Sequence, residues 1–179
     1  MVNEIIKRNG ITYGVITGVI LCLITASMYA IDLELFIAWW TTLLSFSVII
    51  IVPIISLSKA KKELNGILPY KEAFTSYFIA AAIGILISIA FKIILINFID
   101  PSVKDTLLDL TIKYLINTSE KFGVPASAMN ETISKLKESD PFSIVEQLKG
   151  SVFNLFFCAI LGLIIAAFFK SKSTSQEYK

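Results

Sequence analysis

The sequence predicts an all-α fold: an integral membrane four-helix bundle with amphipathic helices in an extracytoplasmic loop. Hydrophobic residues make up 55% of the 179 residues, and the mean hydropathy is +0.76. These residues gather in runs, each close to the ~20 residues with which an α-helix crosses the ~30 Å hydrocarbon core of a bilayer. A helix of a soluble domain shows a periodic apolar stripe instead. We therefore expect a single membrane domain over residues 1–179.

Composition also argues against several classes of function. The chain has no histidine, the commonest metal ligand and a frequent general base. Cys22 and Cys158 lie inside apolar runs without a C-x-x-C spacing, so we interpret them as packing residues rather than as a disulfide or redox pair. The net charge of +2 is too small to indicate nucleic-acid binding. With no nucleotide loop and no nucleophile–base set, we expect no enzymatic activity, no metal and no cofactor.

The first two apolar runs cover about residues 11–31 and 35–57 and are joined by an acidic turn at 32–34. The first run is longer than the ~7–15 apolar residues of a signal peptide, so we expect it to remain in the protein as a span. Trp39 and Trp40 stand near the start of the second run, where an aromatic belt at a membrane interface is expected.

The third run, residues 73–98, is the stretch around which we expect the bundle to be organised. It contains Lys92, a charged residue within an apolar run. Its long stem can reach the outer interface, or its amine can pair with Asp32 or Glu34. An ionisable residue inside a span is also a functional candidate, so coupling to a substrate or a proton remains the alternative.

The sizeable polar segment, residues 100–150, precedes the fourth run at 152–169. Apolar residues recur in this segment at helical spacing, which predicts amphipathic helices. Their apolar faces could cap the bundle, lie on the outer leaflet or bind a partner, and capping is the expectation we favour. Capping and breaking residues predict the helix limits. The predicted limits are Asp100–Pro101 for the first start, Gly123 for its end, Pro125 for the second start, and Pro141 for a last helix that continues unbroken through the fourth run.

Basic residues predict the orientation. With an even number of spans, the N-terminus, the loop after the second span and the C-terminus share one side, which carries nine basic residues against six on the other. Because cytoplasmic loops are enriched in Lys and Arg, we expect both termini in the cytoplasm and residues 100–150 outside it. The nine are Lys7, Arg8, Lys59, Lys61, Lys62, Lys71, Lys170, Lys172 and Lys179.

Small residues recur at every fourth position in three of the runs. Membrane helices associate through close backbone approach and polar contacts, which small residues at i, i+4 permit. Either the first, third and fourth spans pack together through these ridges, with the second span more peripheral, or the first-span glycines face another copy or another membrane subunit. For Asn154 we favour a bond across helices over substrate binding. The helix-packing or interface candidates are Gly10, Gly14, Gly18, Ala80, Gly84, Ser88, Asn154 and Gly162.

Several motifs resemble a known bacterial family, the domain of unknown function 4199. They are Ile11-Thr-Tyr-Gly-Val-Ile-Thr-Gly18, the basic loop after the second run, Leu68-Pro-Tyr-Lys-Glu-Ala-Phe74, and the helical loop before the last run. The resemblance covers about residues 5–170. It implies a small four-span protein of the inner membrane, of a kind found mainly in Bacteroidetes, and it assigns no catalytic residues.

Two functions follow as expectations. The ridges and the long outer loop favour a non-enzymatic accessory or scaffolding subunit of a cell-envelope membrane complex. The alternative is a small oligomeric transporter or channel that uses Lys92 and Asn154, and a water-accessible cavity reaching Lys92 would favour it. The expected partners are the lipid bilayer and either another membrane subunit or further copies of this chain, and no nucleic acid is expected.

Overall fold

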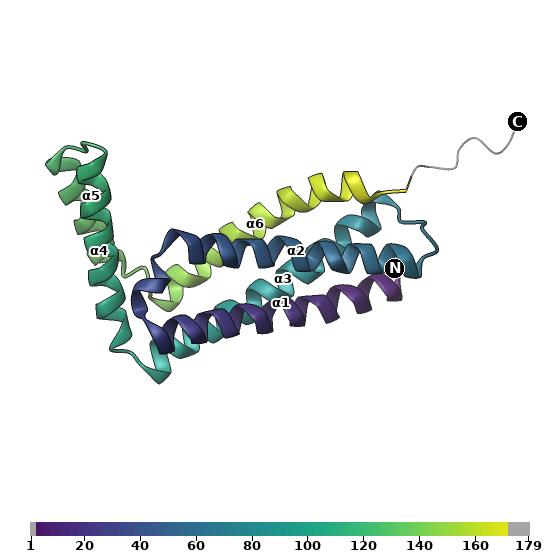
Figure 1. Cartoon of the computed structure of the whole chain (residues 1–179), viewed down its shortest axis with the longest axis horizontal. Coiled ribbons are helices and arrows are strands. Elements are labelled where there is room, and N and C mark those ends of the chain that lie inside the picture. Colours follow the sequence, from purple (N-terminus) through teal and green to yellow (C-terminus); the bar gives the residue numbers. More distant parts are fainter. Residues whose placement is uncertain (1–2, 172–179) are drawn as a thin grey trace, which may run out of the picture.

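The computed structural model describes residues 3–171, which are mainly helical and contain no β-strand (Figure 1). This confirms the all-α fold class. Lys172 and Lys179, which entered the orientation argument, lie outside the described residues. The elements are α1 (Glu4–Ile31), the 3₁₀ turn η1 (Leu33–Phe36), α2 (Trp39–Glu63), α3 (Tyr70–Ile94), the π turn η2 (Leu95–Ile99), α4 (Val103–Lys121), α5 (Ala126–Ser139) and α6 (Ile144–Phe169).

Four helical segments of the described chain are long and apolar enough to cross a bilayer: α1, α2, α3 with η2, and α6. The chain is therefore a multi-pass membrane protein. At one end of the bundle, called the terminal end here, lie the start of α1 and the end of α6 (Figure 1). At the opposite end, called the loop end, lie α4 and α5. The helices extend past the predicted apolar runs because polar residues continue them, with Asn3 capping α1 through the Ile5 amide at 3.0 Å.

The turn before α2 differs from the sequence prediction. Residues 35–38 were expected to open the second span, but α2 begins at Trp39. The Asp32 carboxylate accepts a hydrogen bond from the Glu34 amide at 2.9 Å, and this starts the 3₁₀ turn η1. The Thr41 hydroxyl then donates to the carbonyls of Leu35 and Ala38, at 2.5 and 2.7 Å, and so ties the turn to α2.

The predicted start of the first loop helix is also wrong by a few residues. Asp100 and Pro101 do not open a helix, and α4 begins at Val103 after Ser102. The reason is that the Asp100 carboxylate accepts hydrogen bonds from the hydroxyls of Ser102 and Tyr29, at 2.5 and 2.9 Å, instead of capping a helix.

Of the other helix limits predicted in the loop, some agree with the structure and one does not. Gly123, with φ of +66°, follows the end of α4, and Pro125 precedes α5, both as predicted. The last helix does not run unbroken from Pro141, because Asp140 adopts a left-handed conformation with φ of 39°. It begins at Ile144, after Ser143 accepts a hydrogen bond from the Glu146 amide at 3.3 Å.

Helix α3 is the centre of the bundle, as expected, and packs against α1, α2 and α6. The prediction for the second span is wrong: α2 packs against both α1 and α3, whereas α6 packs mainly against α3. The Ser56 and Ser76 hydroxyls form a buried hydrogen bond of 3.2 Å between α2 and α3. At the terminal end, Glu63 of α2 accepts hydrogen bonds from Arg8 and Asn9 of α1, at 2.6 and 3.2 Å.

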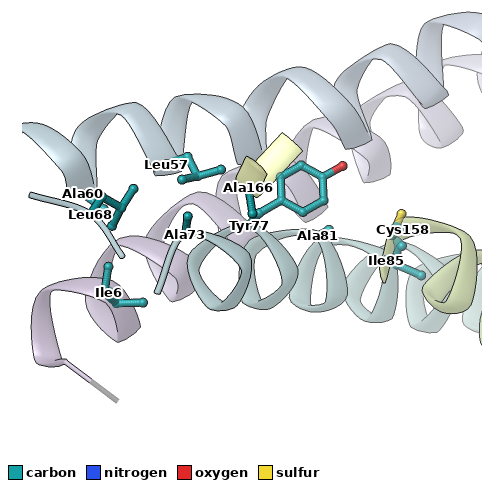
Figure 2. Close-up of a cluster of buried hydrophobic side chains, with 10 residues drawn as sticks. All are labelled: Ile6, Leu57, Ala60, Leu68, Ala73, Tyr77, Ala81, Ile85, Cys158 and Ala166. Carbon is teal, nitrogen blue, oxygen red and sulfur yellow. The ribbon is translucent and has the colours of Figure 1, made fainter. Parts of the chain in front are cut away.

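The apolar core lies in the terminal half of the bundle (Figure 2). Tyr77 of α3 is fully buried there, beside Ala166 of α6. Cys158 is buried in the same cluster, in agreement with the packing role predicted for it, and Cys22 of α1 is half-buried. The other members of the cluster are Ile6, Leu57, Ala60, Leu68, Ala73, Ala81 and Ile85.

A smaller cluster lies at the loop end, where Val103 and Leu107 of α4 are buried with Ile96 of η2. Helix α4 runs across the end of the bundle, roughly at right angles to the spans (Figure 1). Its first half therefore caps the bundle, in line with the expectation. Helix α5 packs against α4 and has no buried residue, so the second half of this hairpin projects away from the bundle.

Candidate functional site

The small-residue ridges pack inside the chain. Three α1 glycines face isoleucines of α3, and a Cβ added at any of them would lie 2.9 Å or less from an isoleucine side-chain carbon. Gly84 of α3 fits against Thr17, and Gly162 of α6 fits against Tyr77. These glycines therefore lie against other helices of the same chain, and Ala80 of α3 is fully buried. The facing pairs are Gly10 with Ile79, Gly14 with Ile83, and Gly18 with Ile87.

A pocket of about 310 Å³ lies between the spans in the loop-end half of the bundle. Residues from α1, η1, α2, α3 and α6 line it. This size is at the lower end of the ~300–1,000 Å³ typical of small-molecule sites. The apolar walls are Leu21, Met28, Phe36, Phe46, Ile49, Ile85 and Ile89, and the polar lining is Thr25, Thr41, Thr42, Ser45, Ser88, Lys92 and Asn154.

Lys92 carries the charge of this lining. It is half-buried in the last turn of α3 and lies about 33 Å along the helix from Tyr70, at ~1.5 Å per residue. The ion pairs within residues 3–171 do not include Lys92, so the pairing with Asp32 or Glu34 considered from the sequence is not found. The π turn η2 begins three residues later, and such turns occur often at functional sites.

Most hydroxyls of the pocket differ from other hydroxyls in the spans in their hydrogen bonding. Thr17, Ser27 and Ser47 each donate to the carbonyl four residues earlier at 2.8 Å, which satisfies the hydroxyl within its own helix. Inside the pocket, Thr41 is likewise engaged by backbone carbonyls. The side chains of the other lining polar residues make no hydrogen bond to a described residue. These are Thr25, Thr42, Ser45, Ser88, Lys92 and Asn154.

The polar side chains of this lining can donate hydrogen bonds to a group in the pocket. Groups that face the pocket without a hydrogen-bond partner in residues 3–171 can pair with a polar occupant. An ammonium group supplies positive charge and three N–H donors, and hydroxyls and an amide add further donors. Oxyanions, such as phosphate or carboxylate, accept from all of these groups.

Of the residues singled out in the sequence, the structure brings Lys92, Ser88 and Asn154 to this one pocket. Ser88 and Asn154, which were predicted as helix-packing or interface residues, both line the pocket. Asn154 is exposed on α6, has no hydrogen bond to another described helix, and lies on a helix that packs mainly against α3 and makes little contact with α2.

Among the pocket residues not predicted from the sequence are three whose hydroxyls have no hydrogen bond to a described residue: Thr25, Thr42 and Ser45. A signal was present, since Thr42 and Ser45 are one helical turn apart on α2. Aligning the spans by their loop ends would have placed these hydroxyls near the level of Lys92. Thr25 of α1 faces the same space because of the way α1 is rotated about its axis. The contacts of the α1 glycines with α3 determine that rotation.

Comparison with known proteins gives one match. A family model described as "Protein of unknown function (DUF4199)" matches residues 12–171. No curated protein and no solved structure matches the chain.

Proposed function

Because the chain belongs to the DUF4199 family, whose description names no activity, we propose from its own pocket that it is a small membrane transporter that binds an anion. Lys92 provides the charge, and Asn154 and the pocket hydroxyls provide further hydrogen-bond donors. The observation that carries the proposal is a lysine that has no ion pair within residues 3–171 and lines a partly polar pocket between spans. Intramembrane ionisable residues in transporters commonly mark substrate paths. The proposed mechanism is non-enzymatic.

Binding is tested by thermal unfolding of the purified full chain in mild detergent, with phosphate and acetate as probes at constant ionic strength. A ligand that binds only the folded state stabilises it by about 2.7 kcal/mol at a concentration one hundred times its Kd. We expect one of these anions to raise the Tm of wild type and of Lys59→Met, but not of Lys92→Met. Lys59 is the matched control because it is exposed on α2 at the terminal end.

Transport is tested by uptake of the stabilising anion into vesicles that contain the protein. Uptake by wild type that Lys92→Met and Asn154→Leu reduce would support the proposal. Equal uptake by wild type and Lys92→Met, or equal stabilisation of both by every anion, would refute a role for this pocket.

A second candidate, an accessory or scaffolding subunit of a cell-envelope complex, is favoured by the α4–α5 hairpin. No residue of α5 is buried, and near the hairpin tip Phe122 is 81% exposed. Crosslinking in native membranes followed by mass spectrometry tests this candidate. A stoichiometric partner that crosslinks to the hairpin, and that Phe122→Ser weakens, would favour the subunit over the transporter.

The proposed location is the bacterial inner membrane, with both termini cytoplasmic and the hairpin outside. The excess of basic residues on the terminal side supports this orientation. A reporter that is active only in the cytoplasm should be active when it is fused after Lys179. An extracellular reporter signal at that position would reverse the orientation.

A further inference from the structure

The pocket of Lys92 reaches the lipid-facing surface of the bundle. Asn154 lines the pocket and is also exposed on α6, between Phe153 and Leu155. Phe153 is 70% exposed, as expected for a side chain that faces lipid. A polar side chain without a hydrogen bond on such a surface is unfavourable unless the opening it borders takes a polar group.

Helices α2 and α6 both contribute residues to the pocket lining. These two helices share a far smaller contact than α3 makes with any of the other spans. Phe46 of α2 and Phe157 of α6 meet with ring centroids 5.5 Å apart. Phe46 also lines the pocket, with Ile49 one turn further along α2. The pocket therefore has a charged side at Lys92 and an aromatic, apolar side toward the bilayer.

A pocket with one charged side and one apolar side fits an amphiphile better than a fully polar solute. An anionic headgroup can accept from Lys92 and the hydroxyls, while an apolar chain can lie along Phe46, Phe157 and Ile49 and continue into the bilayer. Lys92 lies in the last turn of α3, seven residues before the span ends at Ile99, so a headgroup that reaches it must enter the span by about 10 Å, at ~1.5 Å per residue. A lipid in this leaflet reaches the pocket without crossing water.

We propose that the ligand of this pocket is an anionic lipid or single-chain amphiphile that enters sideways between α2 and α6, with its headgroup at Lys92. The inference rests on the proposed anion-binding function and names its ligand class. The headgroup chemistry, a phosphate or carboxylate, is shared with soluble anions, so the test must separate the two sources.

The experiment uses the full chain in phosphatidylcholine vesicles with phosphatidic acid that carries a photoreactive diazirine in its acyl chain. The control probe is phosphatidylcholine with the same chain. We expect phosphatidic acid to label the segments around Phe46 and Phe157 more than the control probe does. Labelling should fall about tenfold in Lys92→Met, the factor that a loss of about 1.4 kcal/mol of binding free energy gives.

Two variants protect the result against misfolding. Lys92→Arg keeps the positive charge and should retain at least part of the labelling. Lys149→Met removes an exposed lysine from the same end of the bundle, one that pairs with Glu146 at 2.6 Å, and should leave the labelling unchanged. Circular dichroism and gel filtration check that each variant is folded.

The outcomes separate the two proposals. Equal labelling by both probes, or labelling that is unchanged in folded Lys92→Met, overturns the lipid inference. If phosphate or acetate stabilises the protein through Lys92 but phosphatidic acid does not label the pocket, anion binding stands and the lipid inference fails. If neither the soluble anions nor the lipid depends on Lys92, both proposals fail.

Discussion

Tyr29, near the end of α1, donates a hydrogen bond of 2.9 Å to the carboxylate of Asp100, the residue that follows η2. The bond joins two residues 71 positions apart in the sequence. It holds the loop end of α1 against the segment that leads into α4, next to the small cluster around Ile96. The hydroxyl of Ser102 also donates to this carboxylate. Asp100 thus links the end of a span to the segment that leads into α4, which caps the loop end of the bundle.

These bonds predict a pH dependence. The hydrogen bond from Ser102, followed by that from Tyr29, lowers the pKa of Asp100 below its ordinary value of 3.8. Because the folded-state pKa is the lower one, the stabilisation is complete above about pH 4 and is lost as the pH falls through 3.8 toward the folded-state value. Asp100→Asn should therefore lower the Tm at pH 7, and the difference from wild type should shrink toward pH 3.

Thermal unfolding of wild type and Asp100→Asn across this range, in the same detergent, provides the measurement. Tyr29→Phe, which removes one donor and keeps the ring, should show a smaller version of the same difference. A difference that stays constant from pH 7 to pH 3 would contradict the role given to the Asp100 carboxylate.

The glycine at position 84 should tolerate no side chain. A Cβ added there would lie 2.5 Å from Cγ2 of Thr17 on α1, so the two helices would have to separate. We expect Gly84→Ala to destabilise the fold by about 1–3 kcal/mol, the usual cost of overpacking.

Gly150→Ala is the matched control, because this α6 glycine has no heavy atom within 4 Å of an added Cβ. It should leave the Tm unchanged or raise it, since alanine is favoured over glycine in a helix by up to about 1 kcal/mol. Equal effects of the two substitutions on the thermal unfolding temperature would argue against the close approach of α1 and α3.

The buried hydroxyl pair Ser56 and Ser76 should couple α2 to α3. Their 3.2 Å bond lies where neither hydroxyl can reach water. In a double-mutant cycle with Ser56→Ala and Ser76→Ala, we expect a coupling energy of about 0.6 kcal/mol, the average for hydrogen bonds between membrane helices. Equilibrium unfolding in detergent measures each corner of the cycle. Strict additivity of the single substitutions would show that the two hydroxyls do not interact.

The substitution Tyr77→Phe should make the protein more stable. Its ring is fully buried, but its hydroxyl has no hydrogen-bond partner within the described chain. A buried hydroxyl without a partner costs about 1–3 kcal/mol, so Tyr77→Phe should raise the Tm. Tyr77→Ala, which removes the ring that packs on Gly162, should instead lose about 3–5 kcal/mol. A fall in Tm for Tyr77→Phe would mean that the hydroxyl makes a bond in the membrane.

The sequence alone determined the four spans and the helical hairpin that follows the third. Whether a segment spans a bilayer depends on its own length and apolarity, because a helix satisfies its backbone hydrogen bonds within itself. Gly123 and Pro125 predicted the end of α4 and the start of α5, because glycine and proline act on the backbone at their own positions. Asp100 and Pro141 failed as start signals because partners distant in sequence, such as Tyr29, or a left-handed residue, Asp140, changed the local conformation.

Only the tertiary structure decided which faces of the spans meet. The glycines of α1 could have faced another molecule, and their use against Ile79, Ile83 and Ile87 depends on how α1 is rotated against α3. That rotation also brings Thr25 to the space that Lys92 and Asn154 line. Side chains from five elements form the pocket. Because these elements are far apart in the sequence, no local sequence pattern predicts that their side chains meet. Packing between distant helices, rather than the pattern within any one of them, creates the site.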